Sequence, residues 1–170
     1  MIRNTPTATG PATATTSAHG AQVLPVPPPL FYGLAFAVGM VLHAMIVPLP
    51  MGGGLARVVP GPILVGAGFA LAGSAVARVR RRHTTIVPHR PVAALLTDGP
   101  YRLSRNPMYT GLALTYLGCT VLADTWWPLL TLPVALLGIQ ALVIGPEERY
   151  LATRFGHGYT DYTQHTRRWL

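Results

Sequence analysis

The chain has 170 residues, of which 50% are hydrophobic and only 11% are charged, and its formal net charge is +8. A soluble domain of this length could not bury so much apolar surface in one core, so the composition indicates an integral membrane protein. The excess of arginine does not indicate nucleic-acid binding, because the cations lie beside apolar runs rather than along a polar face with stacking aromatic residues.

Residues 1–29 form a tract rich in threonine, alanine and proline that ends in PVPPP. Such a tract has too little apolar surface to offset the entropy lost on ordering, so we expect a disordered arm. A signal peptide is not expected, because Arg3 is the only arginine or lysine before the first apolar run, which starts as late as Leu30. Residues 30–170 are expected to form one membrane domain.

Four apolar runs approach the length of ~17–25 residues that a helix needs to cross the hydrocarbon of a bilayer. They cover residues 30–47, 60–79, 107–123 and 126–144. Only Asp124 and Thr125 separate the last two runs, so we expect a tight antiparallel hairpin there. The predicted fold is all-α, with about four transmembrane helices, a C-terminal helical hairpin and a cytosolic cap to which residues 145–170 contribute.

Two features inside the runs bear on packing. The second run carries small residues at three- and four-residue spacing, which we expect to form a packing face for another helix: Gly66, Ala70, Gly73, Ser74 and Ala77. His43, in the first run, is an ionisable residue within a span, so it is either a functional group or a neutral histidine that a neighbouring helix satisfies.

The arginine residues predict the orientation of the spans. RVRRRH at residues 78–83 directly follows the second run, and further arginines lie at 102, 105 and between 149 and 168, whereas the opposite side shows only Arg57. Because positive residues favour the cytosolic side, both termini and residues 78–106 are expected there. We expect a multi-pass integral membrane protein, located in a bacterial inner or plasma membrane.

Two polar clusters flank the last two runs: TDGPYRLSRNPMYTG at residues 97–111 and GPEERYLATRFGHGYTDY at residues 145–162. Each reads as an ordinary helix start, with Asn106 and Pro107 in capping positions and two glutamates after Gly145-Pro146. Arg105 does not fit that interpretation, because it is a cation near the positive end of a helix dipole. Together with free helix N–H groups it predicts a pocket for a carboxylate or phosphate.

In this order, GPYRLSRNPMYTG, an apolar hairpin and PEERYLATRFGHGYTDYTQHTRRWL resemble the isoprenylcysteine carboxyl methyltransferase and phospholipid methyltransferase superfamily of integral membrane enzymes. The resemblance covers about residues 84–170. It implies S-adenosylmethionine as the methyl donor, bound at the cytosolic face, with Glu147 as the carboxylate for its ammonium group. The other implied donor contacts are Ala93, Ala94, Leu95, Leu96, Tyr101, Asn106, Pro107, Met108 and Tyr109.

Two positions depart from the pattern of that superfamily. Asn106 stands where many members have histidine. Val143 stands where the eukaryotic prenylcysteine enzymes have an arginine that serves the substrate, so a prenylcysteine carboxylate loses its main support.

The predicted function is methyl transfer from S-adenosylmethionine to a lipophilic or membrane-associated small molecule. An amine acceptor must lose a proton before attack, which would require a base such as His89 or Glu148, whereas a carboxylate or thiolate acceptor would not. Arg105 is the third candidate catalytic residue. A metal is not an expected partner, and Cys119, the only cysteine, cannot build a cysteine metal site within one chain. Nucleic acid is not expected either, because the cations lie beside apolar runs.

Two other functions remain open. One is an NADPH-dependent enzyme similar to the sterol reductases, which share an Arg, His, Pro, Asn, Tyr pattern but contain many more spans. The other is a non-catalytic membrane scaffold or transport subunit, which the few polar residues inside the spans do not favour.

Overall fold

The computed structural model describes residues 27–82 and 94–170, and in these parts the regular structure is helical. The helices are α1 (Pro28–Met45), α2 (Pro60–Arg81), α3 (Pro107–Leu122), α4 (Trp127–Ile139), α5 (Gly145–Phe155) and α6 (His157–His165). Short turns of 3₁₀-helix, η1 (Gly54–Arg57) and η2 (Gly99–Arg102), precede α2 and α3. The described residues contain one isolated bridge, Pro50 with Thr125, and no strand, as the prediction of an all-α fold requires.

Among the described residues, three stretches are long and apolar enough to cross a membrane: Pro28–Met45, Gly54–Arg81 and Trp127–Phe155. They are the stretches expected of an integral membrane protein. Helix α3, the third predicted run, has 16 residues and is not among them, so the predicted count of four spans is not confirmed. Helices α1, α2 and α3 start and end within two residues of the predicted runs, and α4 starts one residue after the predicted start of its run.

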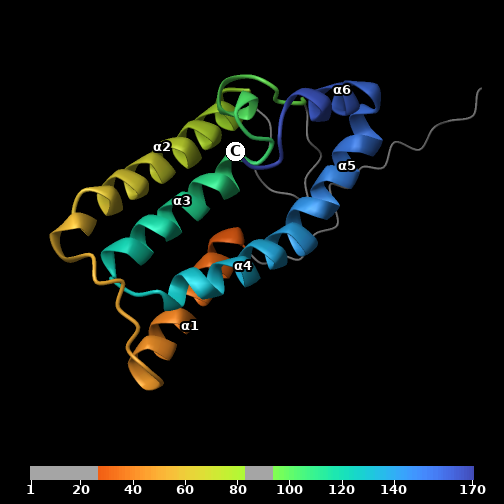
Figure 1. Cartoon of the computed structure of the whole chain (residues 1–170). Coiled ribbons are helices and arrows are strands. Elements are labelled where there is room, and N and C mark those ends of the chain that lie inside the picture. Colours follow the sequence, from red (N-terminus) through yellow and green to blue (C-terminus); the bar gives the residue numbers. More distant parts are fainter. Residues whose placement is uncertain (1–26, 83–93) are drawn as a thin grey trace, which may run out of the picture.

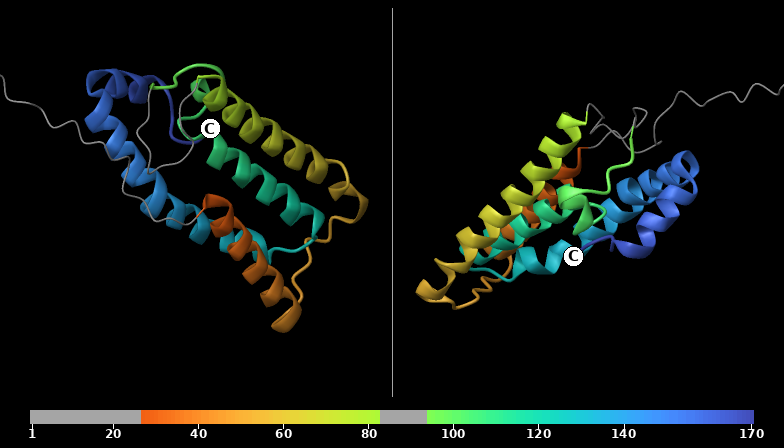
Figure 2. Two further views of the ribbon diagram at one scale, coloured as in Figure 1. Left: turned by 180° about the vertical axis from the view of Figure 1, so that it is seen from behind. Right: turned by 90° about the horizontal axis from the view of Figure 1, so that it is seen from above.

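Helices α2 and α3 lie side by side along most of their lengths (Figures 1 and 2). Two glycines of α2, Gly61 and Gly68, face Gly118 and Gly111 of α3. A Cβ atom on Gly68 would lie 2.5 Å from the carbonyl oxygen of Gly111, and one on Gly111 would lie 2.6 Å from that of Gly68. Only glycine allows the two backbones to approach this closely.

The predicted packing face of α2 was wrong. Its members, Gly66, Ala70, Gly73, Ser74 and Ala77, are all exposed, whereas Gly61, Gly68 and Ala75 on another face are buried. Both sets have helical spacing, so periodicity could not choose between them. The contacts with α3 show which face packs: Gly61 and Gly68 approach Gly118 and Gly111, whereas a Cβ atom on Gly66 or Gly73 would meet nothing within 4 Å.

The predicted tight hairpin of α3 and α4 is also corrected. The turn between them is short, but α4 packs mainly against α1, as Figure 1 shows. Thr131 donates a hydrogen bond to the carbonyl oxygen of Ala35 at 2.9 Å, and a Cβ atom on Gly39 would lie 2.7 Å from the Cα atom of Pro128. Close backbone contact at Gly39 therefore brings α4 to α1, while α3 pairs with α2.

Helices α4 and α5 form one continuous helical stretch through a π-helical turn, η3 (Gln140–Ile144). The sequence predicted a new helix after Gly145-Pro146. The π-turn explains why the helix does not stop: the N–H of Gly145 bonds to the carbonyl of Gln140, and the wider turn accommodates Pro146, which has no N–H to donate. The chain breaks instead at Gly156, whose φ of +50° favours glycine.

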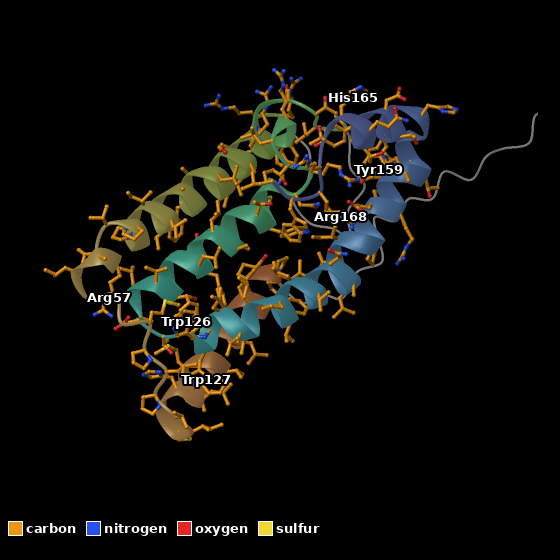
Figure 3. The ribbon with its side chains drawn as sticks, viewed as in Figure 1. Arg57, Trp126, Trp127, Tyr159, His165 and Arg168 are labelled. Carbon is orange, nitrogen blue, oxygen red and sulfur yellow. The ribbon has the colours of Figure 1, made fainter. Side chains whose placement is uncertain are left out.

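The molecule has two polar ends. At the turn end, where α3 leads into α4, Arg57 pairs with Asp124 at 2.7 Å. Trp126 and Trp127 lie at the same end, as Figure 3 shows. His43 is satisfied there: its Nδ1 accepts hydrogen bonds from the backbone N–H of Leu49 at 3.3 Å and from the Thr125 hydroxyl at 2.9 Å. This contact supports the packing interpretation of His43. The other end, where α2 ends and α3 begins, is called the site end below.

Candidate functional site

Two adjoining pockets lie at the site end, and Val79, Tyr101, Arg105, Asn106 and Glu147 line both. The larger one encloses about 600 Å³ of space between the protein atoms, open solvent at its mouth included. Its remaining lining residues are Ala94, Leu95, Leu96, Glu148, Leu151, Tyr159 and Tyr162. The smaller one adds Pro107, Met108 and Tyr109.

The segment before α3 is attached to the helices on both sides. Asp98 accepts hydrogen bonds from the Arg78 Nε atom at 2.7 Å and from the Arg82 Nη2 atom at 2.8 Å. These contacts lower the pKa of the Asp98 carboxyl to about 2, and the hydrogen bond from Arg78 has the largest effect. The hydroxyl of Tyr162 donates to the carbonyl oxygen of Tyr101 at 2.5 Å. The wall formed by residues 94–106 is therefore fixed to α2 and α6.

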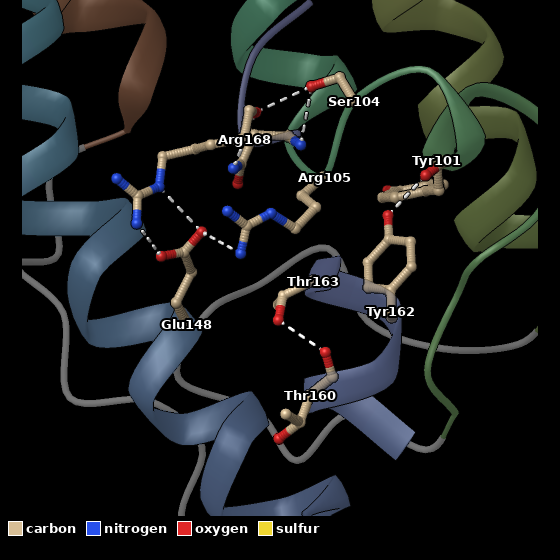
Figure 4. Close-up of polar contacts among 9 residues, drawn as sticks. Tyr101, Ser104, Arg105, Glu148, Thr160, Tyr162, Thr163 and Arg168 are labelled. Atoms are coloured by element: carbon tan, nitrogen blue, oxygen red, sulfur yellow. Dashed lines mark hydrogen bonds and ion pairs between the residues drawn. The ribbon is translucent and has the colours of Figure 1, made fainter. Parts of the chain in front are cut away.

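The two adjacent glutamates of α5 have different partners. Glu148 is held by guanidinium groups: Arg168 donates to both of its oxygens, at 3.0 and 2.6 Å, and Arg105 approaches one of them at 3.3 Å (Figure 4). Glu147 accepts a hydrogen bond from the Tyr109 hydroxyl at 3.2 Å. In residues 27–82 and 94–170 no basic side chain forms an ion pair with Glu147. The pocket therefore contains one carboxylate without a counter-ion among the described residues.

Arg105 is a partly satisfied cation. Its side chain is 16% exposed, its one ion pair is the 3.3 Å contact with Glu148, and its Nε atom is buried without a hydrogen-bond partner in the described part of the chain. A buried, unsatisfied N–H of a charged group is costly, so an orphan of this kind indicates a ligand or a water molecule at that point.

Three tyrosines, Tyr101, Tyr159 and Tyr162, line the larger pocket. Burial raises the pKa of each hydroxyl. At neutral pH they are uncharged phenols, which present ring faces to a cation and hydroxyls that can donate hydrogen bonds.

The structure brings the predicted site residues of both sequence clusters together. Every predicted site residue that the structure describes lines one of the two pockets. These are nine of the ten predicted donor contacts, Glu147 among them, and the candidate catalytic residues Arg105 and Glu148. Ala93 and His89 lie outside the described residues. The described residues contain no group of His, Cys, Asp and Glu that could hold a metal ion, and the expected absence of a metal stays a prediction.

Sequence reasoning did not assign Val79, Leu151 and Arg168 to the site. Val79 and Leu151 are apolar residues in apolar or amphipathic helices, so nothing in the sequence distinguishes them. Arg168 lies 20 positions from its partner Glu148, and only the folded chain shows their contact. Tyr159 and Tyr162 belong to the spaced tyrosines of the second cluster and could have been included on that basis.

Comparison with known proteins identifies the family. The model of the phospholipid methyltransferase family matches residues 56–158, which include α2 and therefore extend further toward the N-terminus than the resemblance over residues 84–170. Comparisons with curated proteins and with solved structures gave no match. Since the family match covers well over half of the chain, the protein belongs to the phospholipid methyltransferase family of membrane enzymes.

Proposed function

We propose that the protein transfers a methyl group from S-adenosylmethionine to a lipophilic acceptor, and that the pockets at the site end bind both molecules. The family indicates a membrane methyltransferase. One observation supports the donor in particular: the larger pocket combines Glu147, a carboxylate without a cationic partner among the described residues, with the half-buried Arg105, whose Nε–H has no hydrogen-bond partner among them.

The amino-acid part of S-adenosylmethionine is complementary to this pair. Its ammonium group would lie at Glu147, beside the Tyr109 hydroxyl that already orients the carboxylate. Its carboxylate would accept hydrogen bonds from Arg105, whose planar group suits a two-pronged contact. The tyrosine rings of the pocket suit a sulfonium cation.

S-adenosylmethionine supplies a methyl group that its positive sulfur already activates. The residues of this chain would have to hold the donor and acceptor in line and to exclude water. The site suits these tasks, because Val79, Leu95 and Leu96 give it apolar walls. The contact of Asp98 with Arg78 fixes the segment that contains Leu95 and Leu96 to α2.

The acceptor atom decides whether a base is required. Glu148 is a poor candidate for that base, because both of its carboxylate oxygens already accept guanidinium hydrogen bonds. His89 lies outside the described residues. A carboxylate or thiolate acceptor, which needs no base, fits the described residues as they stand.

The acceptor is proposed to be a membrane-associated small molecule other than a prenylcysteine. Val143, at the position of the substrate arginine of the prenylcysteine enzymes, is 1% exposed and belongs to the apolar core. A substrate carboxylate would find no cation at that position.

Isothermal titration calorimetry on the detergent-purified chain tests the proposal, with S-adenosylmethionine and NADPH as separate ligands. We expect binding of S-adenosylmethionine only. Binding of NADPH alone would favour the reductase-like function, and binding of neither would favour a scaffold or transport subunit. Glu147→Gln, which changes one oxygen to an amide nitrogen, is the matched variant and should lower the donor affinity.

A further inference from the structure

The last residues of the chain, Thr166–Leu170, cross the site end between the start of α3 and α5, and are called the C-terminal strap here. The backbone N–H of Arg105 donates to the carbonyl oxygen of Arg167 at 2.8 Å, and the buried Ser104 hydroxyl donates to that of Arg168 at 3.0 Å. Trp169 packs against the apolar core. The strap therefore holds the segment that contains Arg105.

The strap also provides Arg168, which contacts Glu148 more closely than Arg105 does. Arg168 donates to both oxygens of this carboxylate, whereas Arg105 reaches only Oε1, at 3.3 Å, which Arg168 already contacts at 3.0 Å (Figure 4). Glu148 is 15% exposed, so its charge requires a close partner. With Arg168 in place that requirement is met, and Arg105 keeps unused hydrogen-bond donors. Without Arg168, Glu148 would take the guanidinium of Arg105.

The strap lies beyond the part of the chain that the family model matches, which ends at residue 158. Its contacts are contacts of this chain and do not follow from family membership. The side chain of Arg168 is 37% exposed and that of Arg105 only 16%. This difference suits Arg168 to neutralise Glu148 from outside while Arg105 faces the pocket.

We infer that Arg168 is a positioning residue of the donor site: by holding Glu148, it keeps Arg105 free to bind the carboxylate of the donor. The inference rests on the proposed function. Arg168 does not line either pocket. Its removal should therefore weaken binding of the donor's carboxylate and leave binding of the rest of the donor unchanged.

The test compares two ligands by calorimetry on the detergent-purified full chain: S-adenosylmethionine and its decarboxylated analogue, which keeps the ammonium and sulfonium groups. The unmodified chain should bind S-adenosylmethionine about tenfold or more tightly, the effect of a charged hydrogen bond. Arg168→Gln should reduce that preference to about threefold or less while leaving the analogue's affinity unchanged. Arg167→Gln removes the same charge from an exposed neighbour and should keep the preference.

The double variant Glu148→Gln/Arg168→Gln should restore the preference, because it also removes the competitor for Arg105. Equal loss of affinity for both ligands in Arg168→Gln, or an unchanged preference, would overturn the inference. If Arg168→Gln does not fold, Arg168→Lys takes its place, and an intermediate preference is expected; a full preference or an equal loss would again overturn it. Failure of the unmodified chain to bind either ligand would overturn the proposed function, and this inference with it.

Discussion

Glu147 and Glu148 are chemically identical neighbours whose partners give them different expected roles. Glu147→Gln removes the counter-charge proposed for the donor's ammonium group, so donor binding should weaken by about 2–5 kcal/mol. Glu148→Gln leaves two arginines without their shared partner, so the free energy of unfolding should fall by about 1–3 kcal/mol, a value reduced for the partial exposure of Arg168. Calorimetry and thermal unfolding measure the two effects. Similar effects of both variants on donor affinity would contradict the assignment.

Arg105 combines two roles, and one of them could not be seen in the sequence. Its position near the positive end of a helix predicted an anion site, and the structure adds an ion pair with Glu148. Arg105→Gln should therefore lower both thermal stability, by about 1–2 kcal/mol, and donor affinity, by about 1.5–3 kcal/mol.

Arg105→Lys separates the two roles of this residue. A lysine can keep the charge beside Glu148 but cannot make the two-pronged contact with a carboxylate. Stability should recover more fully than affinity for S-adenosylmethionine. Full recovery of both would mean that charge alone matters at this position.

At the level of the helices, the close contact of α2 and α3 makes a sharp prediction. Gly68→Ala forces a methyl group against the backbone of α3, so it should lower stability by about 1–3 kcal/mol, the cost of an overpacked interface. Gly66→Ala is the matched control: a Cβ atom there meets nothing within 4 Å, so this variant should not destabilise the protein. Thermal unfolding in detergent provides the comparison, and equal losses in both variants would contradict this helix pairing.

The sequence predicted the helices well and their pairing poorly. Apolar runs bounded by prolines and by Asp124-Thr125 determine where helices start and end, so those limits could be read from single segments. Which helices touch depends on two surfaces at once, as at Gly68 with Gly111 or at Gly39 with Pro128, and a single run holds only one of them.

The candidate site was more predictable than the helix packing for a related reason. Its residues are polar and stand beside long apolar runs, so Arg105, Asn106 and Glu147 were conspicuous. The sequence could not show which charges would neutralise one another. The contact of Arg168 with Glu148 arises only when the C-terminal strap folds back onto α5.

For the whole molecule, the proposed orientation places the site end in the cytosol, because arginines cluster there. In a Cys119→Ser background, Leu55→Cys puts a label at the turn end, where residue 55 is 87% exposed, and Thr160→Cys puts one on the exposed surface of α6. An impermeant thiol reagent should label the first variant in intact cells and the second only after permeabilisation. The reverse pattern would place the site on the outer side of the membrane.

The central claim is that both polar clusters form one donor site. Ultraviolet cross-linking of radiolabelled S-adenosylmethionine to the purified protein, followed by peptide mapping, tests it most directly. The label should appear in peptides from residues 94–109 and from residues 147–162, and excess S-adenosylhomocysteine should remove it from both. Label confined to one of these segments, located at the turn end, or insensitive to S-adenosylhomocysteine would contradict a single donor site built by the two clusters.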